Sequence, residues 1–148
     1  MAREPIAAWF YALVAVRRGD SFLALREASH EQGWYLPAGQ CEAGERLTGA
    51  AVRECLEETG VAVELDGVLR VEHEVYPTGA RVQVIFTGHA APGAQPPQTH
   101  ADEHSLEARW VTLDELRRLP LRHPEVLHIF EQLAAGVQPA PLSVLVER

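Results

Sequence analysis

The segment from residue 48 to residue 59 constrains the fold most strongly, because its pattern is helical and its charge is concentrated. Gly60 follows it, at the position where a left-handed C-terminal helix cap favours glycine. At 3.6 residues per turn, the side chains of Glu54, Glu57 and Glu58 fall within an arc of about 100°. The sequence therefore predicts a helix that gathers three carboxylates on one face.

The two sides of this helix are expected to differ. Ala50 and Ala51 lie on the side of the glutamates, whereas Val52, Cys55 and Leu56 point the other way. We expect the apolar side to pack on the protein and the acidic side to be presented. Like charges at these spacings cost about 0.2 to 0.5 kcal/mol per pair, and their crowding raises the pKa of at least one carboxyl. A solvated acidic surface is the ordinary role of such a helix.

Strand and helix patterns alternate along the rest of the chain. Strands are predicted at residues 6–16, 21–27, 61–76, 81–91 and 107–113, a strand running into an irregular loop at 34–40, and helical segments at 113–119 and 123–136. The two longest strand segments form a hairpin. This order predicts an α/β protein with helices packed on a mixed sheet. Residues 91–106 carry no periodicity, and so long a loop in a compact domain is more often functional.

The length and charge of the chain limit its classes of function. A chain of 148 residues has the usual size of one domain, so we predict a single domain over residues 1–148. Phosphate contacts in nucleic-acid binding need clustered Lys and Arg. The formal net charge of -8 and the lack of a basic stripe therefore predict no nucleic-acid partner.

The cysteines and the apolar segments bear on location and assembly. Cys41 and Cys55 match no disulfide framework or metal-ligand spacing, which favours free thiols in a reducing cytoplasm. The apolar run at residues 6–16 is too short to cross a membrane, and no cleavage site follows it. We therefore expect a cytoplasmic protein without a membrane segment. The apolar tail at residues 141–148 is a candidate late strand that could extend a sheet across a homodimer.

The helix belongs to a longer pattern of fixed spacings. The pattern consists of Gly39, Glu45, Arg53-Glu54, Glu57-Glu58 and Gly60, followed by apolar Val61. A chance match of these residue types is expected in fewer than about one chain in a million. Residues 39–61 resemble the signature of the Nudix hydrolases, pyrophosphohydrolases that include the MutT-like enzymes. Two positions depart from it, since Cys55 replaces a usually aliphatic residue and Ala38 a frequent glycine.

The resemblance implies a fold, a cofactor and a reaction. The fold is the Nudix fold, an α/β/α sandwich with a mixed β-sheet between helices. The reaction is attack of water on a phosphorus of a diphosphate linkage, assisted by Mg²⁺ or Mn²⁺, which prefer oxygen ligands. By position, Glu57 and Glu58 would be the main metal ligands. Glu54 would be a further ligand or the base, and the main-chain carbonyl of Ala38 would complete the site.

Other positions of the signature have structural roles in the family. Arg53 and Glu45 resemble its paired residues, in which the arginine bridges to the glutamate and holds the loop against the helix. Gly39 and Gly60 match its structural glycines. These four residues are expected to position the chemistry without performing it.

Further site residues are predicted outside the signature. Many members have another glutamate on a distant loop that acts as base or ligand, and Glu103 is the candidate here, followed by Glu107. Solvated loop charge is an equally frequent role for such residues. Arg26 and Arg81 are candidates for phosphate contacts, and Tyr35 for stacking on a base.

Other aromatic residues and the histidines are less specific. Trp9 and Phe10 could also stack on a base, although burial in the core is the more frequent role of an aromatic residue. Trp34 and Trp110 are expected in the core or in a pocket wall. His100, His104, His123 and His128 match no tetrahedral zinc spacing.

The substrate is less constrained than the reaction. Residues 33–39, GWYLPAG, are similar to a segment of MutT-like members that act on nucleoside di- or triphosphates, some of them on oxidised guanine nucleotides. We therefore expect a small nucleotide of this class. Nucleoside diphosphate sugars, dinucleoside polyphosphates and RNA caps remain alternatives, of which long RNA fits the acidic charge least. A non-catalytic nucleotide-binding domain is a further alternative, but such a domain would be expected to have lost signature glutamates.

Overall fold

Eight strands and three α-helices make up the fold. The computed structural model describes the backbone of residues 1–148 and the side chains of all of them except His30. The strands are β1 (Ala7–Arg18), β2 (Ser21–Glu27), β3 (Trp34–Tyr35), β4 (Ala38–Gln40), β5 (Val63–Tyr76), β6 (Gly79–Ala90), β7 (Ser105–Thr112) and β8 (Ala140–Pro141). The α-helices are α1 (Leu47–Thr59), α2 (Leu113–Leu116) and α3 (Glu125–Ala134), and short 3-10 turns span His30–Gln32 and Leu142–Val144.

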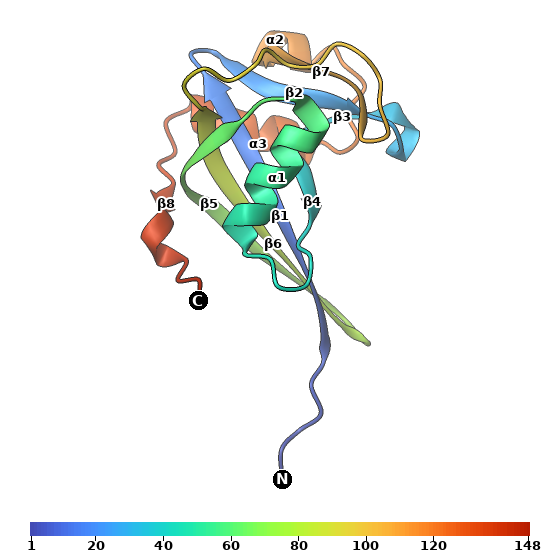
Figure 1. Ribbon diagram of the computed structural model, residues 1–148, viewed down its shortest axis with the longest axis vertical. Coiled ribbons are helices and arrows are strands. Elements are labelled where there is room, and N and C mark those ends of the chain that lie inside the picture. Colours follow the sequence, from blue (N-terminus) through green and yellow to red (C-terminus); the bar gives the residue numbers. More distant parts are fainter.

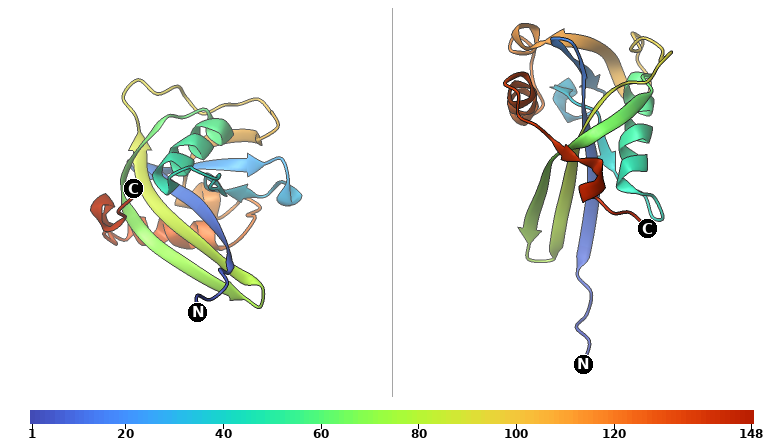
Figure 2. Two further views of the ribbon diagram at one scale, coloured as in Figure 1. Left: turned by 60° about the horizontal axis from the view of Figure 1, so that its bottom comes forward. Right: turned by 90° about the vertical axis from the view of Figure 1, so that its left-hand side faces the viewer.

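The strands form one mixed sheet between helices. Its order is β3-β2-β1-β6-β5-β8, with β4 added beside β1 and β7 beside β2. β1 and β6 run parallel, and β5 and β6 form the predicted antiparallel hairpin. α1 covers one face of the sheet, and α2 and α3 lie on the other (Figure 1 and Figure 2). The prediction of an α/β fold with helices on a mixed sheet is confirmed.

β1 pairs with two different strands along one edge, and this leaves room for residues 36–46, the loop before α1 that we call the signature loop. Its middle, from Tyr11 to Leu13, pairs with β4, whereas β2 pairs with it only at Arg17 and Arg18. The two neighbours therefore share one edge of β1 and diverge from each other. The sequence predicted a single strand running into a loop at residues 34–40, where the structure has two short strands on different partners.

Alternation along β1 also separates the core into two clusters. Leu13 and Ala15 belong to the cluster that α3 covers, where the rings of Phe22 and Phe130 stack with centroids 4.4 Å apart. Ala12, Val14 and Val16, which alternate with them along β1, belong to the cluster beneath α1. One strand thus contributes to both faces, and both helical layers depend on the same sheet.

α1 matches the predicted helix in its bounds but only partly in the side that it buries, since Cys55 is buried as predicted and its two apolar neighbours on that side are not. Its C-terminal cap is Gly60 in the left-handed conformation, with φ 77°. Val52 and Leu56, predicted to pack inward, are 37% and 50% exposed, and Ala50 and Ala51 are fully buried instead. The physical reason is size, because small side chains on the inner side let the helix approach the sheet closely. The glutamates therefore lie at the boundary between helix and sheet.

Two segments near the chain ends also differ from the predictions. Trp9 and Phe10 are exposed rather than buried, because this part of β1 extends with the β5–β6 hairpin beyond the helical layers (Figure 1). In the tail only Ala140 and Pro141 pair with β5, and a 3-10 turn follows where a longer strand was expected. None of the described helices combines the length and the apolar character needed to cross a membrane.

Candidate active site

The signature loop lies against α1 through Gly39. β4 carries this glycine along β1, so its backbone faces the helix. A Cβ atom at position 39 would lie only 2.0 Å from Cδ and Oε1 of Glu54. The absence of a side chain therefore lets the Glu54 carboxylate contact the loop directly, and the spacing of Gly39 and Glu54 in the sequence acquires a steric reason.

Glu58 joins the same loop from the next turn of the helix. Its Oε1 accepts a hydrogen bond from the backbone N–H of Ala38 at 2.8 Å, and the residue is only 9% exposed. Burial raises the pKa of Glu58 well above its ordinary value, and the negative charges of Glu54 and Glu27 raise it further. Burial likewise raises the pKa of Glu54. Two carboxyl groups with elevated proton affinity thus lie beside the loop.

Arg53 links the loop and the acidic face. Its Nε and Nη2 contact Oε1 and Oε2 of Glu45 at 2.7 and 3.0 Å, a bidentate geometry. Its Nη1 donates to Glu54 at 2.8 Å and to Glu57 at 3.2 Å, and Nη2 also donates to the carbonyl of Gln40. The Arg53 hydrogen bond lowers the pKa of Glu45. The predicted contact between Arg53 and Glu45 is therefore present, and its positioning role remains a prediction.

The three glutamates of the signature are not equivalent in this structure. Glu54 and Glu58 meet Ala38 and Gly39, whereas Glu57 is more exposed and has its contact with Arg53, which Glu54 also contacts. Among the described residues, no three or more His, Cys, Asp or Glu side chains are grouped so that they could hold a metal ion. The assignment of Glu54, Glu57, Glu58 and the Ala38 carbonyl as metal ligands stays a prediction.

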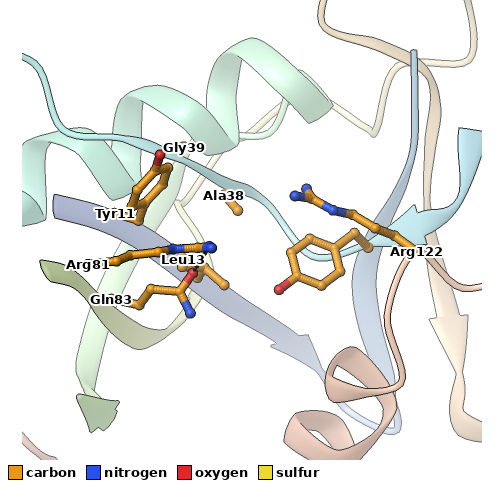
Figure 3. Close-up of a pocket in the computed structure, with 8 residues that line it drawn as sticks. Tyr11, Leu13, Ala38, Gly39, Arg81, Gln83 and Arg122 are labelled. Atoms are coloured by element: carbon orange, nitrogen blue, oxygen red, sulfur yellow. Dashed lines mark hydrogen bonds between the residues drawn. The ribbon is translucent and has the colours of Figure 1, made fainter. Parts of the chain in front are cut away.

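A cavity of about 430 Å³ opens beside the loop. It is lined by Tyr11, Leu13, Tyr35, Ala38, Gly39, Arg81, Gln83 and Arg122. Arg81 and Arg122 reach into it from opposite sides, with Ala38 between them (Figure 3). The guanidinium of Arg81 lies 4.6 Å from the ring centroid of Tyr11, and that of Arg122 lies 4.8 Å from the ring centroid of Tyr35. Two cations held on aromatic rings suit the binding of phosphate oxygens.

The predicted substrate residues are only partly brought together. Tyr35 and Arg81 line the cavity. Arg26 instead lies 3.6 Å from Glu107 across two neighbouring strands. The side chain of Glu103 is strongly exposed, and its Oε1 lies 3.4 Å from Nε2 of the neighbouring His104. The roles of Arg26, Glu103 and Glu107 remain predictions.

The long loop at residues 91–104 contacts the end of α1 rather than the cavity lining. The backbone N–H of Gln98 donates to the carbonyl of Thr59 at 2.8 Å. The hydroxyl of Ser105, the first residue of β7, donates to the carbonyl of Glu58 at 2.7 Å. These contacts fix the C-terminal turn of α1, which carries two of the signature glutamates.

Four cavity residues, Tyr11, Leu13, Gln83 and Arg122, were not predicted from the sequence. Tyr11 and Gln83 are directly opposed in the parallel pairing of β1 and β6, so their side chains share one face of the sheet. Period-two alternation along the two strands was a usable signal for them. Arg122 had no such signal, because it lies in a connection and reaches the cavity through an ion pair with Glu27 at 2.7 Å.

Comparisons with known proteins show the family of the chain. Residues 10–133 match the family described as NUDIX domain. The chain is 36% identical to the human 8-oxo-dGDP phosphatase NUDT18 over 88% of its own length and 40% of that protein. It is 33% identical to the NAD-capped RNA hydrolase NudC of Salmonella heidelberg over 73% of its length, again covering 40% of the relative. The chain therefore spans about 40% of the length of these curated relatives.

A solved structure shows the same fold over nearly the whole chain. The NUDIX hydrolase from Nitrosomonas europaea superposes with a TM-score of 0.80, covering 96% of this chain and 98% of that one. The two sequences are 24% identical.

Proposed function

Because the chain belongs to the NUDIX domain family, we propose that it is a hydrolase that cleaves the diphosphate linkage of a small nucleotide with a divalent metal ion. The observation that carries the proposal is the convergence of Glu54 and Glu58 on Ala38 and Gly39, two residues that line a cavity. Water would attack a phosphorus atom, and a nucleoside diphosphate would yield a nucleoside monophosphate and phosphate. No covalent intermediate is needed for this reaction.

The chemistry of the signature residues fits Mg²⁺ or Mn²⁺. The groups that these residues and Ala38 offer are carboxylates and a main-chain carbonyl, all oxygen ligands of the kind that these hard cations prefer. Glu57 and Glu58 would be the main ligands of the ion, with Glu54 and the Ala38 carbonyl as further ligands. The close approach at Gly39 supports this assignment, since a larger residue would displace Glu54. When bound, the ion neutralises negative charge on the phosphate oxygens.

The chain's own side chains would bind the substrate and accept the proton of the attacking water. Arg81 and Arg122 lie on opposite walls of the cavity and would contact phosphate oxygens. Glu54, if it is not a metal ligand, is our first candidate for accepting the proton of the attacking water, because its carboxylate lies against the loop at Gly39. Glu103, on the loop before β7, is the alternative base, and Glu107 the next.

The relatives favour a nucleoside di- or triphosphate as the substrate. One is named as an 8-oxo-dGDP phosphatase, which supports a guanine nucleotide, oxidised or not. The name of NudC, an NAD-capped RNA hydrolase, supports a capped nucleotide as second candidate. The acidic charge of this chain disfavours contacts with a long RNA. We further propose that residues 1–148 form a single domain that acts in the cytoplasm on small molecules and assembles as a homodimer.

A nucleotide panel tests these assignments. Nucleoside di- and triphosphates, their 8-oxo-guanine forms, a nucleoside diphosphate sugar and a dinucleoside polyphosphate would each be incubated with the protein in Mg²⁺ or Mn²⁺. Chromatography of the products identifies the bond that is cleaved. We expect a nucleoside di- or triphosphate to give the highest kcat/KM. Preference for the sugar nucleotide or the dinucleotide would establish the alternative substrates, and nucleotide binding without cleavage would indicate a non-catalytic domain.

A further inference from the structure

A second cavity adjoins the first on the side away from the signature loop. Its volume is about 510 Å³, and it shares Tyr35, Arg81, Gln83 and Arg122 with the first cavity. It extends from this shared wall to the start of α3. A ligand with phosphates near Ala38 and Gly39 would therefore have its remaining part in the second cavity.

Two carboxyl groups from distant parts of the sequence form the far side of this cavity. Glu72 comes from β5 and Glu125 from the first turn of α3. Arg70 lies between them, with Nε 3.0 Å from Glu72 and Nη2 3.2 Å from Glu125. One guanidinium thus faces two carboxyl groups.

Neutral donors fix the orientation of both carboxyl groups. The hydroxyl of Tyr35 donates to Oε2 of Glu125 at 3.2 Å, and Nε2 of Gln83 donates to Oε2 of Glu72 at 3.0 Å. Each carboxylate oxygen can accept more than one hydrogen bond, so both groups keep acceptor capacity for a ligand. Burial and the nearby Glu125 raise the pKa of Glu72. The far side of the cavity is therefore a preorganised set of acceptors.

Base chemistry decides which ligand fits such acceptors. Guanine presents a ring N–H and an exocyclic amino group side by side, two parallel donors that match the two oxygens of one carboxylate. Adenine and cytosine place a ring acceptor beside the amino group, and uracil and thymine place carbonyls on both sides of the ring N–H. Those edges set an acceptor against a carboxylate and leave polar groups unpaired, which is costly in a partly buried site.

We propose that Glu125 and Glu72 are specificity residues that accept hydrogen bonds from the ring N–H and amino group of a guanine-type base. The inference rests on the proposed function, since it assumes that the phosphates lie at Arg81, Arg122 and the signature loop. Oxidation of guanine at C8 leaves this edge unchanged. The pair therefore selects guanine over other bases and does not itself distinguish the oxidised from the unoxidised form.

Substitution of each carboxyl group tests the proposal. We would measure kcat/KM for dGDP and dADP with wild type, Glu125→Gln and Glu72→Gln, and the Kd of dGMP and dAMP by calorimetry. Glu131→Gln is the matched control, because Glu131 lies on the same helix and pairs with Arg117 outside the cavity. We expect Glu125→Gln to lower kcat/KM for dGDP about 10-fold to 100-fold through KM, and to change that for dADP less than about threefold. Glu72→Gln should act in the same direction.

The outcomes separate this inference from the proposed function. Equal Kd values for dGMP and dAMP in the wild type, or equal losses for dGDP and dADP in both variants, would overturn the inference even if the protein is a hydrolase. Selective dGMP binding that Glu125→Gln removes, in a protein that cleaves no nucleotide, would support the inference and contradict the hydrolase. Thermal unfolding of each variant identifies any that fails to fold, and the other variant then decides.

Discussion

Gly39 determines how closely the signature loop approaches α1. The Glu54 carboxyl group occupies the space that a Cβ atom would need, at a separation of 2.0 Å. We predict that Gly39→Ala displaces Glu54 and lowers kcat at least about 10-fold, because a misplacement of about 1 Å can cost about 100-fold in rate. The displaced atoms belong to the end of a flexible side chain, so thermal unfolding should change little.

Gly49→Ala is the matched control for this substitution. Gly49 lies in α1, and a Cβ atom there would meet only Glu45 Cγ, at 3.8 Å. Alanine in a helix interior is favoured over glycine by roughly 0.5 to 1 kcal/mol, so this variant should be more stable and equally active. Full activity of Gly39→Ala would show that the position of Glu54 against the loop does not matter for turnover.

At the level of elements, α1 shows what local pattern can and cannot predict. Its bounds and its glycine cap follow from propensity and periodicity, and the structure places both within one residue of the prediction. The buried side does not follow, because the prediction assigned large apolar residues to the core. The helix packs through Cys55, as predicted, and through the small Ala50 and Ala51 in place of Val52 and Leu56, and this brings Glu58 to the backbone of Ala38.

The side of α1 that packs against the sheet gives a stability prediction. Ala51 is fully buried against the sheet, whereas Val52 is 37% exposed. Ala51→Leu should destabilise the protein by about 1 to 3 kcal/mol through overpacking. Val52→Leu should change the free energy of unfolding by less than about 0.5 kcal/mol. Denaturant unfolding of both variants measures the difference, and the reverse order of effects would mean that the helix buries the side predicted from sequence.

The site itself was predictable where the spacing of residues fixes it, and unpredictable where the sheet register does. Glu54, Glu58 and Gly39 lie within one local segment, so their sequence pattern already places them together. Gln83 and Arg122 reach the cavity only through strand pairing and a long-range ion pair. Glu72 and Glu125 meet through the packing of α3 on the sheet, which no local pattern specifies.

At the level of the whole molecule, two cores share one sheet. Trp34 belongs to the cluster beneath α3, and Trp110 packs against the cluster beneath α1. We predict a single cooperative unit. A variant that retains Trp34 but not Trp110, and one that retains Trp110 but not Trp34, should each give a fluorescence transition in denaturant that coincides with its circular dichroism transition. Two separated transitions would contradict a single domain over residues 1–148.

The rate of diphosphate hydrolysis by the full chain tests the central claim most directly. We would measure nucleoside monophosphate release from the best nucleotide of the panel in Mg²⁺, with and without chelator, for wild type, Glu57→Gln, Glu58→Gln and the control Glu131→Gln. We predict that chelation abolishes turnover, that readded Mg²⁺ or Mn²⁺ restores it, and that each signature variant loses at least about 100-fold in kcat while the control retains full activity. Turnover that is unchanged by chelation, or unchanged in both Glu57→Gln and Glu58→Gln, would contradict a metal-dependent hydrolase built on the α1 glutamates.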